Sequence, residues 1–463
     1  MMNDIFVILQ YCLGYKRNIS NVVASIDWQK LYSFVSKQAL LGLCFDGIER
    51  LGKEYPEELK RNPIGRELLM NWMGNAQQIR RQNVKVNGVA AKLYSKFRKD
   101  GLRCCILKGQ GNALMYPNPY SRTPGDIDVW VNASREDITD YAKTHFEIGD
   151  DIRFHHLETS FDGVPVELHF FPGIMNNPIY HARLQKWFRR NADLQSSHIV
   201  GLPDGAGDIA IPTMAFNVIY QLCHLYHHFF DEGIGMRQII DYFLVVNDFS
   251  KNVFLDYDFS NHPVPLSKEG STFSPSPSQW SLHPLRFPRF RGTETSGSGD
   301  VTAPSRCSEP LRSKDGGASK PSPDCAGWDR RGVSGDTSSA FTTDSSASTA
   351  LVVVQRELKY LGLWKFAGAV MYVLKEVLGL AEDKMIVPMD EKRGRLLLAE
   401  ILDGGNFGRH FTKYAGFTHQ SMGKKYFLKI WRNMHFVRYY PAEALSEPIF
   451  RTWHFFWRVK NKK

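Results

Sequence analysis

The sequence predicts an α+β protein in which a small mixed β-sheet core is flanked by N- and C-terminal helical regions. Three observations predict this class. Residues 1–100 repeat apolar side chains at the spacing of amphipathic helices. Residues 101–205 contain short apolar or alternating runs, such as LRCCIL, DIDVWV and VPVELHF, which are typical of strands. Residues 206–255 and 351–463 return to helical periodicity and are predicted to form a C-terminal helical domain.

A segment of different composition, residues 256–350, interrupts this helical domain. Of residues 261–350, 46 of 90 are Ser, Thr, Gly or Pro, and apolar periodicity is weak. Such a stretch buries too little apolar surface to offset its chain entropy, so we predict that it is disordered. An insertion into a helical domain accounts for it, because the cost of closing a loop rises only slowly with length.

The cysteines and the N-terminal residues exclude several classes of protein. The seven cysteines are scattered and contain no CxxC pair, which argues against a disulfide framework or a structural zinc site and favours a reducing cytoplasm. The apolar run near the N-terminus is short and broken, and an acidic residue precedes it. We therefore expect neither a signal peptide nor a transmembrane segment.

Positive charge is concentrated in residues 411–463, which hold eleven Lys or Arg, two Glu and fourteen aromatic residues. This pattern fits an amphipathic helix whose aromatic face packs against the body of the protein. The alternative is a surface that contacts nucleic acid, nucleotide phosphates or anionic lipid.

Two aspartates, Asp126 and Asp128, stand one residue apart in the strand-like run GDIDVWV. Because alternate residues of a strand share a face, these carboxylates lie on one face, while Ile127, Val129 and Val131 lie on the other. Neighbouring like charges are unfavourable unless a cation neutralises them, and Mg²⁺ commonly takes one or two carboxylates together with substrate phosphates. The alternatives are a strand edge exposed to solvent and a turn that follows Pro124-Gly125.

A second run, VPVELHF, repeats the pattern and follows the turn Asp162-Gly163 of a predicted hairpin. Its apolar residues alternate with Glu167 and His169. If this strand lies beside the first with both apolar faces toward the helices, Glu167 joins the two aspartates. Three carboxylates on one sheet face suit a two-metal site for phosphoryl or nucleotidyl transfer.

The series ILKGQG, GDIDVWV and VELHF resembles the nucleotidyltransferase fold of the DNA polymerase β superfamily. More narrowly, with the preceding helix DWQKLYSFVSKQALLGL, it is similar to an uncharacterised bacterial nucleotidyltransferase family. The resemblance covers most of the chain outside the insertion and implies that residues 101–205 form a nucleotidyltransferase core. It further implies that Asp126 and Asp128 bind Mg²⁺, and that Glu167 binds a second Mg²⁺ or acts as a base.

The resemblance also implies a nucleotide-binding set. Gly109 and Gly111 would allow the backbone to approach the triphosphate, and Lys108 and Arg122 would offset phosphate charge. One departure is Gln110, which stands where the superfamily usually has Ser or Gly, so a hydroxyl contact to phosphate is missing.

The expected reaction is Mg²⁺-dependent transfer of a nucleoside monophosphate from an NTP to an acceptor hydroxyl or phosphate, with release of pyrophosphate. The sequence leaves the acceptor open among small molecules, proteins and RNA. The alternative is a non-catalytic protein that binds a nucleotide or nucleic acid through a degenerate core.

Two further groups on predicted helices carry polar side chains. His224, His227 and His228 have a spacing that can ligate a metal, but no second ligand pair follows, so packing or surface histidines are expected. Arg237 and Asp241 are spaced i, i+4, and we expect a helical salt bridge. The alternative is that Arg237 reaches the nucleotide.

Overall fold

The computed structural model describes residues 2–16, 18–252, 343–411 and 422–461. Most of the predicted disordered segment lies outside the described residues, as do Cys307 and Cys325. The last residues of that segment are described, because helix α12 begins at Thr343, ahead of the predicted boundary at 351.

The chain begins with six helices, of which α6 is the longest. Asp27 caps α3, since its carboxylate accepts a hydrogen bond from the backbone N–H of Lys30 at 3.0 Å. The helices span α1 (Met2–Cys12), α2 (Ser20–Val23), α3 (Trp28–Lys37), α4 (Leu41–Glu54), α5 (Pro56–Arg61) and α6 (Arg66–Lys99).

A five-stranded mixed sheet follows, in the order β1-β2-β5-β4-β3, in which β2 and β5 are parallel and the other neighbours antiparallel. The strands are β1 (Cys104–Leu107), β2 (Ile127–Val131), β3 (Glu147–Ile152), β4 (His156–Phe161) and β5 (Val164–His169). A separate pair contains β6 (Ile199–Gly201) and β7 (Asp208–Ala210). The short helices between the strands are α7 (Gly109–Ala113), η1 (Pro119–Ser121) and α8 (Arg135–His145), and α9 (Pro178–Ser197) precedes β6. The predicted α+β class is thus confirmed.

The predicted hairpin joins β4 and β5 through Asp162 and Gly163. Both residues have positive φ, 48° and 68°, and Phe161 pairs with Val164 across the turn. A two-residue turn of this kind matches the twist of the flanking strands, which explains the Asp-Gly sequence.

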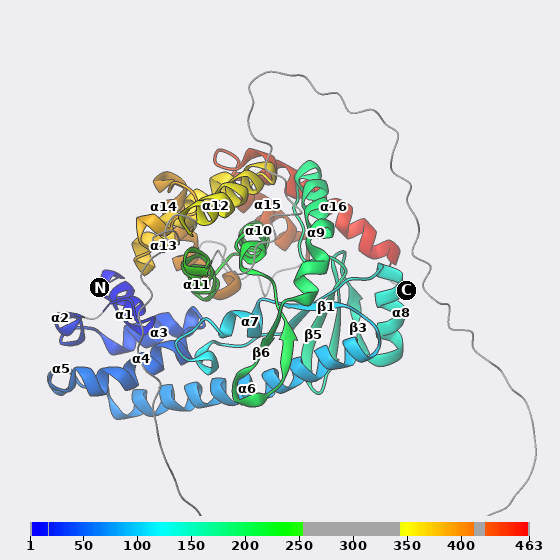
Figure 1. Cartoon of the computed structure of the whole chain (residues 1–463). Helices are drawn as coiled ribbons and strands as arrows, with labels where there is room; N and C mark the ends of the chain where they lie inside the picture. Colours follow the sequence, from blue (N-terminus) through cyan, green and yellow to red (C-terminus); the bar gives the residue numbers. More distant parts are fainter. Residues whose placement is uncertain (1, 17, 253–342, 412–421, 462–463) are drawn as a thin grey trace, which may run out of the picture. The chain divides into compact units, whose positions relative to one another are not determined.

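Each face of the sheet packs against helices, as Figure 1 shows with α6 along one side of the strands. On that face, Ile127, Val129 and Val131 join a core with residues of α6 and α8. On the opposite face, Trp130 stacks on Phe216 of α10, with ring centroids 5.8 Å apart. The second face is also the one that carries the predicted carboxylates, so α10 lies over the candidate site.

The helices after the sheet form the second helical region. They are α10 (Met214–Asp231), α11 (Met236–Asn252), α12 (Thr343–Tyr360), α13 (Trp364–Leu378), α14 (Glu391–Gly404), α15 (Met422–Met434) and α16 (Pro441–Asn461). Helix α12 packs against α10, and α13 against α11, so helices before and after the undescribed segment share one core.

Among the described residues, we find no helix with the length and apolarity needed to cross a membrane. The five cysteines in this part of the chain are buried and free.

Candidate functional site

The strand register brings the predicted carboxylates of β2 and β5 to neighbouring positions. Asp128 lies directly beside Glu167 in the parallel pair, and Asp126 precedes β2 by one residue. Residues paired in this way point to the same face of the sheet. Asp128 and Glu167 are therefore adjacent on the face that α10 covers, and Asp126 lies just before the first residue of β2.

Asp128 is the most enclosed of the three, with 5% of its surface exposed. Its Oδ1 lies 3.0 Å from Lys108 Nζ and 2.9 Å from His169 Nε2. Burial alone would raise the pKa of Asp128, but these two neighbours outweigh burial and hold the pKa well below its usual range. Asp128 is therefore ionised at neutral pH.

His169 links two of the acids, since its Nε2 also lies 3.3 Å from Glu167 Oε2. Burial opposes the charged imidazole, but the bonds to Asp128 and Glu167 prevail and raise the pKa of His169 to about 9. Burial would likewise raise the pKa of Glu167, and the bond from His169 instead lowers it to about 2.

Asp126 differs from its neighbours because its side chain lies at the open side of the site. The surrounding protein partly shields it from water, and the charges of Asp128 and Glu167 repel it. These effects, in that order, raise the pKa of Asp126 to about 6. When all three acids are ionised, their negative charge thus exceeds the positive charge of Lys108 and His169.

These acids line a cavity of about 460 Å³ between the sheet and the helices α10, α15 and α16. Its wall is rich in basic and histidine side chains. The basic residues that line it are Lys108, Arg153, Arg409, Lys429, Arg451 and Arg458, and the histidines are His155, His156, His169, His224, His227, His228 and His454. The wall also holds the acids Asp231, Glu232 and Glu447, and Asp231 pairs with Lys429 and Arg451. A wall with both signs of charge suits a ligand that carries phosphate together with a bound cation.

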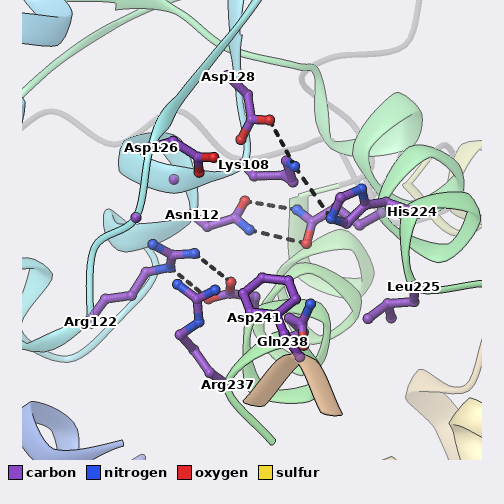
Figure 2. A pocket seen from close by; sticks show the side chains of 14 residues that line it. Lys108, Asn112, Arg122, Asp126, Asp128, His224, Leu225, Arg237, Gln238 and Asp241 are labelled. Atoms are coloured by element: carbon purple, nitrogen blue, oxygen red, sulfur yellow. Dashed lines mark hydrogen bonds and ion pairs between the residues drawn. The ribbon is translucent and has the colours of Figure 1, made fainter. Parts of the chain in front are cut away.

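A smaller cavity of about 60 Å³, which Asp126 and Asp128 also line, is shown in Figure 2. Lys108 stands between Asp128 and His224, with its Nζ 3.3 Å from His224 Nε2. Asn112 and Gln221 exchange two amide hydrogen bonds of 3.1 and 2.8 Å across this cavity. Lys108 itself adopts a positive φ of 52°, an unusual conformation for a lysine that turns the chain from β1 into α7.

Arg122 lies on the wall of the smaller cavity, but its guanidinium is already paired. Its Nε and Nη2 donate to the two carboxylate oxygens of Asp241 at 2.9 and 2.8 Å, and Tyr116 also donates to Asp241 at 2.7 Å. The expected helical salt bridge between Arg237 and Asp241 is therefore wrong, because Asp241 is used by Arg122.

Arg237 is consequently left in the smaller cavity. It is buried, donates through Nη1 to Thr123 O at 3.0 Å, and its Nε makes no hydrogen bond with the described residues. Burial and the nearby charge of Arg122 lower its pKa. Sequence reasoning left Arg237 as the alternative ligand of a nucleotide, and its position fits that alternative.

The two predicted glycines have different surroundings. Gly109 lines the smaller cavity and has a positive φ of 38°. Gly111 instead packs against Ile211, whose Cγ2 would lie 2.9 Å from an added Cβ. Gln110 is buried and its amide bonds Asn87 on α6, so it does not contribute to either cavity.

The three helix histidines were predicted to be packing or surface residues rather than metal ligands, and that interpretation stays a prediction. His224, His227 and His228 all line the larger cavity. Burial and then the charge of Lys108 lower the pKa of His224 well below its ordinary value, so it is neutral. The spacing alone was too weak a signal, since it says nothing about what the helix face covers.

Sequence reasoning missed His155, His156 and Phe407. The two adjacent histidines stand at the start of β4, where His156 pairs across the hairpin with His169. That pairing follows from the Asp162-Gly163 turn, so counting along the predicted hairpin would have found it. Phe407 reaches both cavities from the loop after α14, and no local pattern indicates this.

The donor set of the three acids fits a hard divalent cation. Carboxylate oxygens are the ligands that Mg²⁺ prefers, and a cation would relieve the repulsion that raises the pKa of Asp126. Lys108 and His169, which lie within 3.0 Å of Asp128, supply positive charge at the same place.

One comparison with known proteins identifies the family of the chain. A family model described as "Uncharacterised nucleotidyltransferase" matches residues 24–260. Among solved structures, the chain is similar to an antigenic nucleotidyltransferase-like protein from Paracoccidioides brasiliensis, with 17% identity over 35% of this chain and 75% of that chain. The TM-score is 0.24, too low to carry an argument. A search of curated proteins found no match.

Proposed function

Because the chain belongs to the family of uncharacterised nucleotidyltransferases, we propose that it transfers a nucleoside monophosphate from an NTP to an acceptor hydroxyl or phosphate and releases pyrophosphate. The acceptor is a small molecule, a protein or an RNA. A reducing cytoplasm is the proposed location of this reaction, and the cysteine pattern supports it.

One observation carries the proposal. Asp128 and Glu167 are paired residues of two parallel strands, Asp126 lies beside them, and all three line a cavity that also holds Lys108, Arg153 and Arg409. A carboxylate cluster opposite cations is the arrangement that nucleotidyl transfer needs, since metal and phosphates must meet at one point.

The three acids would hold Mg²⁺, and two ions would fit the expected chemistry. Bound there, Mg²⁺ neutralises phosphate charge and favours ionisation of the acceptor hydroxyl. Lys108 lies close enough to Asp128 to contact the phosphates of a nucleotide bound to the acids. Arg237 and Gly109 face the smaller cavity, where they would contact the rest of the triphosphate.

The test is substitution of Asp128 by Asn, which keeps the shape of the side chain and removes its charge. The purified chain is incubated with each α-³²P-labelled NTP, Mg²⁺ and cell extract, and label transferred to an acceptor is measured with the pyrophosphate released. We expect wild type to transfer label from at least one NTP and Asp128→Asn to lose at least a thousandfold of that rate, as for removal of a group that acts in the transition state. Glu136→Gln, at an exposed residue of α8 outside both cavities, is the matched control and is expected to keep activity.

Two results would contradict the proposal. Full activity of Asp128→Asn would exclude the carboxylates as the metal site. Nucleotide binding by wild type without pyrophosphate release in any extract would favour the non-catalytic alternative, which the missing hydroxyl at Gln110 supports.

A further inference from the structure

Three histidines meet at one end of the β4–β5 hairpin, beside the carboxylates. His155 directly precedes β4, His156 is its first residue, and His169 is the last residue of β5. His156 and His169 are cross-strand partners, and the backbone N–H of Phe170 donates to His155 O at 3.0 Å. The hairpin ladder therefore fixes the three backbones relative to one another.

The imidazoles are close enough to share one ion. One ring nitrogen from each lies within 4.8 Å of those of the other two. The ring centroids are 4.3 Å apart for His155 and His156, 5.2 Å for His156 and His169, and 5.7 Å for His155 and His169. All three line the larger cavity.

Several of these nitrogens are buried and have no hydrogen bond among the described residues. They are Nδ1 of His155, both ring nitrogens of His156, and Nδ1 of His169. His156 and His169 are only 2% and 3% exposed. Nδ1 of His155 and Nδ1 of His169 have neither a hydrogen bond nor a carboxylate neighbour among the described residues. Buried polar atoms are nearly always satisfied, so these two nitrogens indicate a ligand that binds them.

The other contacts of these rings are those of metal-bound histidines. A ligating histidine usually presents its second nitrogen to a carboxylate, which fixes the ring and raises its basicity. His169 uses Nε2 for Asp128 and Glu167, at 2.9 and 3.3 Å, and its Nδ1 has no hydrogen bond among the described residues. A metal bound at Nδ1 would displace the proton that the charged imidazole carries there, and that proton would pass to the solvent in the cavity. For His156, Nδ1 lies 3.3 Å from Glu167 and Nε2 lies 3.8 Å from Glu158.

We propose that His155, His156 and His169 form a transition-metal site, suited to Zn²⁺, that is separate from the oxygen site for Mg²⁺. Imidazole nitrogens favour Zn²⁺, Co²⁺ and Ni²⁺, whereas Mg²⁺ prefers oxygen ligands. Three histidine ligands leave the fourth position of a tetrahedral ion open to the cavity. The site does not depend on the proposed nucleotidyl transfer.

The experiment uses Co²⁺ as a probe, because tetrahedral Co²⁺ absorbs visible light and replaces Zn²⁺. The full chain is stripped with a chelator, titrated with Co²⁺ in excess Mg²⁺, and then titrated with Zn²⁺. We expect one equivalent of Co²⁺ to give the tetrahedral spectrum and Zn²⁺ to remove it. His155→Ala and His156→Gln are each expected to weaken Co²⁺ binding at least tenfold.

Controls separate this site from its neighbours. His435→Gln, at an exposed residue of the C-terminal region, should leave Co²⁺ binding unchanged. Asp126→Asn should keep the Co²⁺ spectrum even though it is expected to lose label transfer, so the two proposals can fail independently. Thermal unfolding checks that each variant is folded. If His156→Gln does not fold, the effect of His155→Ala on Co²⁺ binding is the test, because His155 is only half-buried.

Two outcomes would overturn the inference. The first is a wild-type chain that gives no tetrahedral Co²⁺ spectrum. The second is a spectrum that His224→Gln abolishes and His155→Ala leaves unchanged, since that would move the site to helix α10.

Discussion

Arg122 and Arg237 show how two similar side chains in one cavity differ in role. Arg122 is held at both oxygens of buried Asp241, whereas Arg237 has one backbone contact and an unbonded Nε. The first arrangement is that of a structural ion pair, and the second leaves donors for a ligand. The prediction that Arg122 offsets phosphate charge remains untested, and the structure offers Arg237 as the better-placed cation.

Substitution of each arginine should separate stability from nucleotide binding. Arg122→Ala leaves Asp241 buried without its partner and is expected to cost about 3–5 kcal/mol of unfolding free energy. Arg237→Gln is expected to raise the KM for NTP about tenfold or more, with a much smaller loss of stability, because Arg237 is not part of an ion pair. Urea unfolding and initial rates check this, and equal losses of stability in both variants would contradict it.

The limits of sequence prediction follow from the same residues. The face of the sheet that carries Asp126, Asp128 and Glu167 was predictable, because the strand period and a two-residue turn fix which side chains share a face. The partner of Arg122 was not, because Asp241 is 119 residues away and a plausible local partner existed at i, i+4. The cluster of His155, His156 and His169 was within reach of the same reasoning, because the Asp162-Gly163 turn pairs His156 with His169 across the hairpin.

At the scale of elements, the N-terminal helices position the loop that carries Arg122. Asn83 of α6 donates to Tyr120 O and Arg122 O at 2.9 and 2.8 Å, and Thr123 donates to Ala39 O at 2.8 Å. Gly42 of α4 packs directly on this loop, because an added Cβ would lie 2.3 Å from Ser121 O. The helical region that was predicted only as a flank therefore supports the site.

Gly42→Ala is expected to displace this loop, destabilise the protein by about 1–3 kcal/mol and raise the KM for NTP severalfold. Gly52→Ala on the same helix is the matched control, since nothing lies within 4 Å of its added Cβ. The control should leave KM unchanged and stabilise α4 by up to about 1 kcal/mol. An identical KM in the two variants would show that α4 does not position the loop.

The start of α16 is attached to the loop before α9 by a buried acid. Glu443 accepts hydrogen bonds from the backbone N–H groups of Asn176 and Asn177 at 2.6 and 3.3 Å. Burial is the largest effect and, with the charge of Glu447, raises the pKa of Glu443 from 4.5 to about 7 despite these bonds.

A raised folded-state pKa gives stability that is present below the unfolded value of 4.5 and is lost as the pH rises through about 7. Glu443→Gln keeps an acceptor and cannot ionise. Between pH 5 and 8, wild type is therefore expected to lose up to about 3 kcal/mol relative to the variant. Thermal unfolding across this pH range measures the difference, with exposed Glu391→Gln as the control. Parallel pH curves for wild type and Glu443→Gln would contradict the prediction.

At the scale of the whole molecule, some aromatic residues of α15 and α16 pack against other rings, and others are exposed to solvent. Rings of Phe450, Trp453 and Trp457 contact Phe154, as the amphipathic interpretation predicts. Phe427 and Phe456 are 70% and 65% exposed. Contact of residues 411–463 with nucleic acid stays a prediction, and these exposed rings beside basic residues are where it would occur.

Fluorescence anisotropy with a single-stranded RNA tests this surface. We expect affinity to fall steeply with salt, the double variant Phe427→Ser/Phe456→Ser to bind at least about tenfold more weakly, and exposed Lys460→Ala to reduce the salt slope by about one. Exposed Lys30→Ala, in α3, is the control. RNA affinity that is absent at low salt, or equal in all variants, would exclude nucleic acid as a partner of this surface.

The ion pairs of Asp231 have a consequence for how the chain can be divided. Asp231 ends α10, before the undescribed segment, and its Oδ1 lies 2.9 Å from both Lys429 and Arg451, which come after that segment. With the shared core of α10 to α13, these contacts connect the two parts of the helical domain without using the chain between them. Residues 1–252 and 343–463 therefore meet the requirement for fragment complementation: two separately made polypeptides whose contacts, rather than a peptide linkage, rebuild the larger cavity.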